Sequence, residues 1–158
     1  MSFKNEIFID TCVFYALLSG NDQLTKICKE ILDELINRYN FKFFTSLWVK
    51  RETLTKLKRI GISYCTKLIE LINELECDVI DIDKNIDEEA MQMFWSHSDK
   101  KWSITDCTSI VLLRNKNLFY VFSADHHFYE AGLSPLIEYD KDSRMPKKSY
   151  NTLENIIY

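Results

Sequence analysis

Four acidic residues lie at places in the sequence where a carboxylate could take part in metal chemistry. Asp10 and Asp125 each come just after a short apolar run, whereas Glu52 and Asp106 lie near the start of segments with helical spacing. Four carboxylates brought together would repel one another and raise one another's pKa values unless a cation neutralised them. Oxygen ligands without a His–Cys cluster favour Mg²⁺, with Mn²⁺ as a substitute, over Zn²⁺. Because Mg²⁺ sites usually keep positions for water and a substrate phosphate, the acids suggest phosphate-ester chemistry.

Taken singly, each acid also has a purely structural explanation. Asp10 and Asp125 can cap helices, and Glu52 can pair with Lys56 four residues later. Asp106 lies three residues after a serine, which is the spacing of a helix capping box. The metal interpretation therefore depends on whether the fold brings the acids to one place.

The elements that must position these acids alternate along the chain. Short apolar segments predict strands at residues 7–9, 41–44, 79–82, 118–122 and 136–137, and stretches of helical spacing lie between them. Asp22, the pair Thr45-Ser46 and Ser103 are the predicted N-caps, and Gly61 and Gly132 are the predicted helix breaks. This alternation predicts a three-layer α/β/α sandwich with a central, mostly parallel, Rossmann-like sheet. In such a sheet the carboxyl ends of the strands and the amino ends of the helices share one edge, where we expect the four acids to meet.

Composition limits the class of protein. A chain of 158 residues that is 46% hydrophobic is long enough for one domain, which we expect over residues 1–140, with a polar tail over 141–158 that could pack on the domain. We expect no membrane span and a cytoplasmic location, because the longest apolar run is short and the N-terminus lacks a secretory pattern. The five cysteines form no CxxC pair, which favours reduced thiols. The net charge of −4 argues against a nonspecific nucleic-acid coat.

Four stretches of this sequence carry a resemblance to a known family. They are Phe8-Ile9-Asp10-Thr11, Glu52 after Thr45-Ser46, Trp102-Ser103-Ile104-Thr105-Asp106-Cys107, and Ser123-Ala124-Asp125-His126-His127-Phe128 before Ala131-Gly132-Leu133. In their order and spacing the chain resembles the PIN-domain nucleases, and within them the VapC-type toxins of prokaryotic toxin–antitoxin pairs, over residues 6–139.

The resemblance implies a role for particular residues. It implies that the four acids bind Mg²⁺ directly or through water, as the catalytic metal ligands Asp10, Glu52, Asp106 and Asp125. It also implies three hydroxyl groups that orient those carboxylates, on Thr11, Thr105 and Ser123. Where this chain has Cys12, the family usually has Asn or Ser.

The implied activity is metal-assisted hydrolysis of RNA. A bound ion lowers the pKa of a water molecule, a carboxylate orients or deprotonates that water, and in-line attack leaves 5′-phosphate and 3′-hydroxyl ends. Because the ligands must be ionised to bind metal, we expect activity that rises with pH and disappears in EDTA.

Several residues outside the acids are candidates for RNA contact. Lys50, Arg51 and Lys56 lie on the segment that carries Glu52 and could hold phosphates, although a solvated helix face explains them equally well. Trp102, in a polar loop near Asp106, could stack on an unpaired base.

Further aromatic residues and two histidines are interpreted more conservatively. For Trp48 and Trp95 we expect packing in the core or an interface. His126 and His127 invite a general-acid role at the leaving oxygen, but exposed imidazoles in a first helical turn are the expectation.

The resemblance also implies partners: a homodimer, and a small antitoxin whose C-terminal segment blocks the acidic site, often with a basic side chain among the carboxylates. Residues 47–76, with an apolar stripe and a break at Gly61, are the predicted antitoxin contact, although packing inside the domain also explains the stripe. Two alternatives remain open. One is a PIN-type RNA-processing nuclease without an antitoxin, and the other is a non-catalytic module whose acidic pocket docks a basic peptide.

Overall fold

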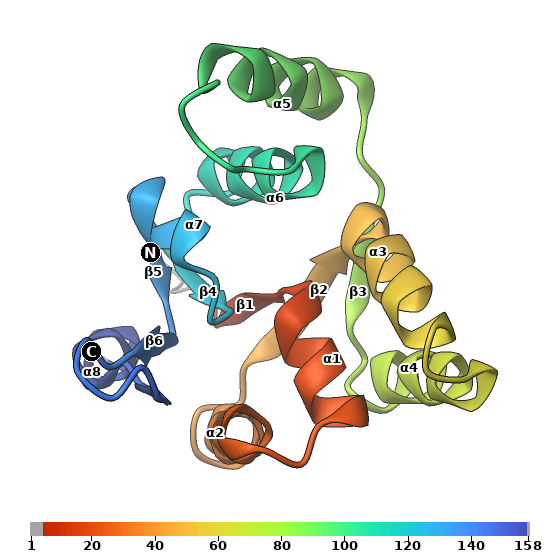
Figure 1. The fold of residues 1–158 in the computed structure, drawn as a ribbon, viewed down its shortest axis with the longest axis vertical. Helices are drawn as coiled ribbons and strands as arrows, with labels where there is room; N and C mark the ends of the chain where they lie inside the picture. The colour runs from red at the N-terminus through yellow and green to blue at the C-terminus, as the bar shows by residue number, and fades with distance from the viewer. Residues whose placement is uncertain (1–4, 158) are drawn as a thin grey trace.

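A five-stranded parallel sheet lies at the centre of the molecule in the computed structural model, which describes residues 5–157 (Figure 1). The strands are β1 (Glu6–Ile9), β2 (Lys42–Ser46), β3 (Asp78–Ile80), β4 (Tyr120–Phe122) and β5 (Ser134–Pro135). Their order is β3-β2-β1-β4-β5, and every neighbouring pair is parallel. The predicted α/β fold with a mostly parallel sheet is therefore confirmed.

Helices cover the two faces of this sheet, which gives the three layers. They are α1 (Thr11–Ser19), α2 (Gln23–Asp33, continued by a π-helical turn over Glu34–Arg38), α3 (Leu47–Lys58), α4 (Ile62–Glu74), α5 (Lys84–Ser96), α6 (Ile104–Asn115) and α7 (His126–Glu130). In Figure 1, α1, α2 and α4 lie on one side of the sheet, and α5 and α6 lie on the other. Right-handed crossovers explain the division, because the chain moves outward from β1 to β3 and then returns across the sheet to β4.

The central strand β1 is buried on both faces. Ile7, Phe8 and Ile9 are each almost inaccessible to solvent, as expected for a strand that has strand neighbours on both sides and helices above and below. The largest fully buried side chains beside it include Phe14 and Phe122. Within residues 5–157, no helix combines the length and the apolar character that crossing a bilayer requires.

The predicted local signals for the helices are largely confirmed. Asp22 and Ser46 accept hydrogen bonds from backbone N–H groups at the starts of α2 and α3, and Ser103 forms a complete capping box at α6. Gly61 (φ 153°) precedes α4, and Gly132 (φ 81°) follows α7, both in backbone conformations that favour glycine.

The C-terminal region differs from the sequence expectation. The predicted last strand at 136–137 is displaced, because β5 ends at Pro135 and Ile137 begins a separate strand, β6 (Ile137–Tyr139). Strand β6 pairs antiparallel with β7 (Pro146–Lys148), and α8 (Tyr150–Ile157) follows. The described part of the C-terminal segment, residues 141–157, expected as a polar tail that could pack on the domain, contains the strand β7 and the helix α8. Strand β7 is held by hairpin pairing with β6 and by the ion pairs of Lys148. Apolar periodicity, on which the strand predictions depend, does not report such contacts.

Candidate metal centre

The ends of β1 and β4 bring Asp10 and Asp125 to one place. Asp10 directly follows β1, and its backbone N–H donates to the carbonyl of Phe122 at the end of β4 (3.1 Å). Ser123 then links the two acids. Its hydroxyl donates to Asp10 Oδ2 (2.9 Å) and accepts from the backbone N–H of Asp125 (3.0 Å). Two adjacent parallel strands therefore deliver two carboxylates to the same edge of the sheet.

Asp106 reaches the same edge from the first turn of α6. Its backbone N–H donates to Ser103 Oγ (3.0 Å), and its own Oδ2 accepts from the backbone N–H of Ser103 (2.8 Å). The capping explanation for Asp106 is thus correct, and it does not exclude a metal role, because the capping bond leaves lone pairs on the carboxylate free.

His127, in the first turn of α7, bridges two of these acids. Its Nδ1 lies 3.1 Å from Asp106 Oδ2 and 3.2 Å from Asp125 Oδ1. Against an ionised carboxylate, Nδ1 must carry the proton and donate it. Potential ligand atoms of Asp106, Asp125 and His127 all lie within 4.8 Å of one another, which marks this place as a candidate metal site. With Nδ1 protonated, His127 orients the two carboxylates and leaves ion binding to their oxygens.

The expectation of two exposed imidazoles is correct for His126 and wrong for His127. The side chain of Asp125 caps α7 by accepting from the backbone N–H of His127 (2.9 Å), and this brings the His127 ring back over the carboxylates. The sequence hints at the contact of His127 with the carboxylates only through its position two residues after Asp125. That spacing alone does not determine where a side chain points.

Burial and mutual repulsion set the electrostatics of the site. Asp10 is 6% exposed, and burial raises its pKa to about 7, with the charges of Asp106 and Asp125 adding to the rise and hydrogen bonds from Ser123 and the Thr11 backbone opposing it. Burial also raises the pKa of Asp106, and the charge of Asp125 adds to it while His127 opposes it. Buried carboxylates that resist ionisation are what a bound divalent cation would stabilise, so the donor set fits such an ion.

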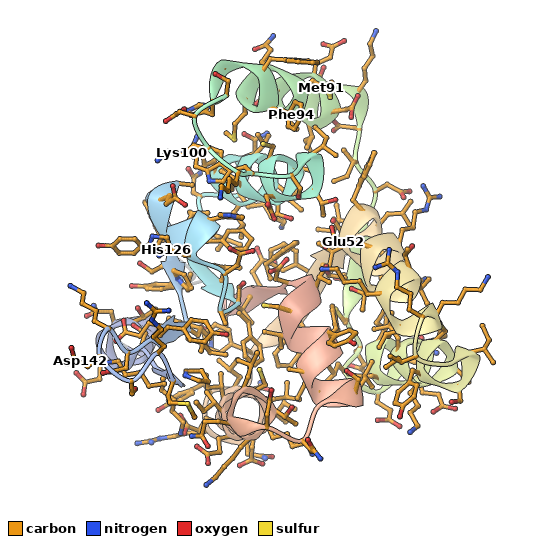
Figure 2. The ribbon with its side chains drawn as sticks, in the orientation of Figure 1. Glu52, Met91, Phe94, Lys100, His126 and Asp142 are labelled. Atoms are coloured by element: carbon orange, nitrogen blue, oxygen red, sulfur yellow. The ribbon has the colours of Figure 1, made fainter. Side chains whose placement is uncertain are left out.

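Glu52 does not join this cluster. It pairs with Lys56 along α3 (Nζ to Oε1, 3.1 Å), as the structural explanation proposed. It lines a separate surface pocket of about 380 Å³ that Arg51, Lys56 and Thr105 also line. In Figure 2, Glu52 lies on α3 and His126 on α7. Thr105 and Asp106 belong to the first turn of α6. Glu52 thus lies beside the residue that precedes Asp106. Like Asp10 it is outside the group of closely spaced ligand atoms, but Asp10 is joined to Asp125 through Ser123, whereas Glu52 pairs with Lys56.

The three predicted orienting hydroxyls differ in their contacts. Ser123 touches Asp10, as described above. Thr11 Oγ1 is buried without a hydrogen-bond partner, and Thr105 makes no side-chain hydrogen bond to a carboxylate within residues 5–157. Cys12 supplies a contact instead, because its Sγ lies 3.6 Å from Asp10 Oδ2 and 3.4 Å from Ser123 Oγ.

The predicted RNA contacts lie in different places. Arg51 and Lys56 line the pocket beside Glu52, and Lys50 is half-buried outside it. Trp102 is a correction: it is 7% exposed and its ring stacks on His97 with the centroids 4.9 Å apart, so no ring face is free for a base. The loop before α6 folds this indole inward, although the loop's polar composition suggested exposure.

Trp48 and Trp95 also depart from the expectation of core packing. They are 38% and 72% exposed, respectively. Trp95 lies near the end of α5, which packs on α6. An indole on the outer side of such a helix lies at the surface, and packing of these two rings in an interface stays a prediction.

Comparisons with known proteins identify the family and the fold. Residues 7–133 match the PIN domain family. Among solved structures, the chain is similar to the Mycobacterium tuberculosis toxin VapC20, described as cleaving the sarcin–ricin loop. That similarity has a TM-score of 0.70 at 23% identity and covers 80% of this chain and 95% of that one. No curated protein matches the chain. Since the family match extends from β1 through α7 and so includes the three aspartates that the strand and helix ends bring together, the chain belongs to the PIN domain family.

Proposed function

We propose that the protein is a divalent-metal-dependent endoribonuclease, the VapC-like toxin of a toxin–antitoxin pair. The observation that carries the proposal is the convergence of Asp10, Asp106 and Asp125 at one sheet edge, where burial and the neighbouring charges raise the pKa values of Asp10 and Asp106. Membership of the PIN domain family and the fold similarity to an RNA-cleaving toxin support it.

The three aspartates would hold the ion, with Glu52 contributing through water from the neighbouring pocket. A bound divalent ion supplies a water molecule of lowered pKa and neutralises charge that develops on the phosphate. Mg²⁺ suits the carboxylate oxygens, and Mn²⁺ would substitute for it. The proposed reaction is hydrolysis of an RNA phosphodiester bond, which leaves 5′-phosphate and 3′-hydroxyl ends.

The chain's own residues would keep the carboxylates in one orientation before substrate arrives. Ser123 donates to Asp10, and the backbone of Ser103 donates to Asp106, so both groups are aimed without any rearrangement. Thr11 and Thr105 would complete this support in the loaded site. Arg51 and Lys56, which line the pocket beside Glu52, would pair with phosphates of the RNA strand, and Lys50 would add charge from the same helix.

Partners follow from the same proposal. Exposed apolar side chains lie at the junction of α3 and α4, where Ile60 and Ile62 are 46% and 69% exposed. We expect an antitoxin to cover this junction and to insert a basic side chain among the carboxylates, which would neutralise them as a cation does. A homodimer and a cytoplasmic location complete the proposal.

The test is cleavage of a structured RNA mixture by the purified protein in Mg²⁺, with and without EDTA. Asp10→Asn should abolish cleavage, whereas Asp78→Asn, at the amino end of β3 and so at the opposite edge of the sheet, should cleave normally. Cleavage that persists in EDTA or in Asp10→Asn would overturn the proposal.

Two further outcomes separate the alternatives. Absence of Mg²⁺ and Mn²⁺ binding in calorimetry would favour the non-catalytic docking module. Metal-dependent cleavage by a protein with no small partner, either co-purifying or encoded by a neighbouring gene, would favour the RNA-processing nuclease.

A further inference from the structure

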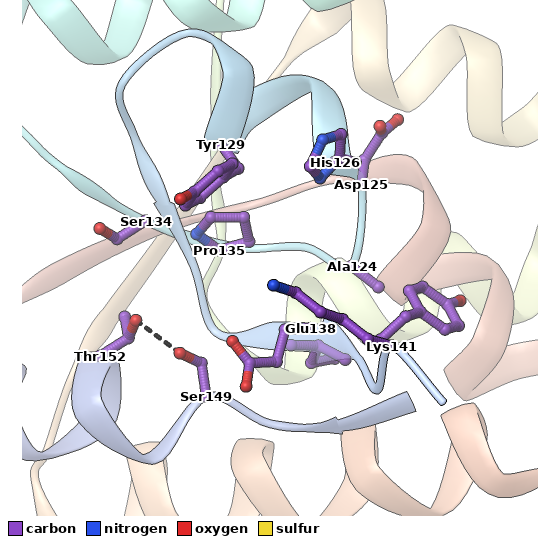
Figure 3. A pocket seen from close by; sticks show the side chains of 12 residues that line it. Ala124, Asp125, His126, Tyr129, Ser134, Pro135, Glu138, Lys141, Ser149 and Thr152 are labelled. Atoms are coloured by element: carbon purple, nitrogen blue, oxygen red, sulfur yellow. Dashed lines mark hydrogen bonds between the residues drawn. The ribbon is translucent and has the colours of Figure 1, made fainter. Parts of the chain in front are cut away.

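A cavity of about 510 Å³ opens directly beside Asp125 (Figure 3). The turn after β4 and helix α7 form one wall, β5 lies at the back, and the C-terminal hairpin and the start of α8 form the opposite wall. Its volume falls in the range of about 300–1,000 Å³ that is typical of ligand pockets. Because Asp125 belongs to both places, a molecule in this cavity would lie next to the candidate metal centre.

Two flat rings border the cavity on the α7 side. His126 and Tyr129 stack with their ring centroids 5.5 Å apart and an interplanar angle of 27°. Tyr129 is 67% exposed, so much of its ring surface is open to a ligand. Exposed aromatic rings of this kind are the surfaces on which unpaired nucleic-acid bases stack.

A lysine reaches into the cavity from the opposite wall. In Figure 3 the side chain of Lys141 extends across the pocket, with its ammonium group directed toward Pro135. Within residues 5–157 no carboxylate lies within ion-pair distance of Lys141, whereas Lys147 and Lys148 of the same hairpin region each pair with carboxylates. An unpaired ammonium group that lines the same cavity as two stacked rings is suited to a ligand that combines a phosphate with a flat base.

The wall that carries Lys141 is held in place by polar contacts. The hydroxyls of Ser149 and Thr152 are hydrogen-bonded to each other (2.8 Å), which Figure 3 marks. The backbone N–H of Ser149 donates to the carbonyl of Leu136 (2.8 Å), which ties this wall to the segment after β5. The cavity is therefore formed before any ligand binds, which reduces the ordering that binding requires.

We propose that this cavity is the subsite for one nucleotide that flanks the scissile phosphate of a single-stranded RNA segment. The base stacks on the ring of Tyr129, which His126 supports from its other side, and Lys141 binds the adjoining phosphate. The inference rests on the proposed function and deepens it, because it assigns to the C-terminal hairpin a part in choosing which RNA is cut.

The test compares Tyr129→Ala and Lys141→Ala with two matched controls. Phe119→Ala removes an equally exposed ring (65%) just before β4, at the opposite edge of the sheet, and Lys84→Ala removes an exposed ammonium group on α5. Single-stranded oligoribonucleotides that contain the mapped cleavage site are the probes, in intact form and with the base deleted on one side of the cut or the other. Their binding is measured by fluorescence anisotropy in the Asp10→Asn background, and their cleavage is measured with the active-site aspartates intact.

Tyr129→Ala should raise the Kd and the KM by about 5- to 10-fold with little change in kcat, since stacking acts on binding. Deleting the base at one flanking position should weaken binding to the wild-type pocket by the same factor as Tyr129→Ala does. With that oligonucleotide, the parent and the Tyr129→Ala variant should have the same Kd. Lys141→Ala should reduce the slope of log Kd against log salt concentration by about 1, the contribution of one phosphate contact. The controls should bind as the parent does.

Failure of the subsite is distinguishable from failure of the proposed function. Metal-dependent cleavage with unchanged Kd, KM and base preference in both variants would overturn the subsite alone and leave the cavity to a protein partner. No RNA cleavage and no RNA binding by the parent protein would overturn both. Thermal unfolding of each variant verifies that the exposed substitutions leave the fold intact.

Discussion

The carboxyl group of Asp10 combines burial with two negatively charged neighbours, and this gives a testable pH dependence. Its pKa lies near 7 in the folded protein against an ordinary value of 3.8, so between these pH values the metal-free folded state binds a proton that the unfolded chain releases. Stability of the metal-free protein should therefore fall as pH rises from about 4 to about 7, by at most about 1.4 kcal/mol per pH unit from this group.

Asp10→Asn should remove that contribution, because an amide does not titrate. In EDTA, the variant should melt at a higher temperature than the wild type at pH 7.5, and the difference should shrink toward pH 4. Calorimetric melting of both proteins across this range measures it. A melting-temperature difference that does not vary with pH would contradict the assignment.

For His127, the contacts with Asp106 and Asp125 could not be predicted from the local sequence. Its Nδ1 holds the carboxylates of Asp106 and Asp125 toward each other, so His127→Ala should let them separate. We expect about 10- to 100-fold weaker Mn²⁺ binding in titration calorimetry, as is typical when a group that orients metal ligands is lost. His126→Ala, which removes an exposed imidazole from the next position, should bind Mn²⁺ normally. Equal affinities in the two variants would exclude this role.

At the scale of elements, helix α6 depends on its first turn both for stability and for the placement of Asp106. Ser103→Ala removes the capping acceptor and should lower the free energy of unfolding by about 1 kcal/mol, which corresponds to a drop of about 2–4 °C in Tm. It should also weaken metal binding, because the turn that carries Asp106 frays.

Asp83→Ala is the matched control for this helix. Asp83 caps α5 through one bond from the backbone N–H of Ile86 (2.9 Å), away from the acids. Its loss should lower stability by a similar amount without changing metal affinity. If Ser103→Ala also left metal affinity unchanged, the capping box would serve the helix alone.

The elements show where sequence patterns suffice. The caps at Asp22, Ser46 and Ser103 are recognisable because they depend on hydrogen bonds within three residues. The predicted last strand begins two residues too late, since burial of Leu136 and Ile137 is shared between the central sheet and the β6–β7 hairpin. Apolar composition reports burial, and it does not report which strand is the hydrogen-bonding partner.

At the scale of the whole molecule, Lys148 attaches the C-terminal hairpin to α2 and to the π-helical turn that continues it. Its ammonium group lies 3.1 Å from Glu30 and 2.8 Å from Glu34, and its side chain is 17% exposed. Lys148→Ala should lower the free energy of unfolding by about 1 kcal/mol, because it removes a largely buried ammonium group that pairs with two carboxylates at once.

Lys147→Ala provides the comparison in urea unfolding. Lys147 pairs with Glu138 and Asp140 at 3.5 and 3.4 Å in a far more exposed setting, so its loss should change stability by less than about 0.5 kcal/mol. Equal effects of the two substitutions would show that the hairpin is not held to α2 by this lysine.

The sequence by itself determined the α/β sandwich and the edge of the sheet at which the acids lie. Of the four acids that it singled out, three converge there. Asp10, Asp106 and Asp125 could be placed because each directly ends a strand or begins a helix, and the geometry of parallel sheets brings such positions together. Only the tertiary structure decided that His127 bridges two of them, that Glu52 pairs with Lys56, and that Trp102 is covered by His97. Those outcomes depend on rotamers and on contacts between segments far apart in the chain, and neither periodicity nor residue type specifies them.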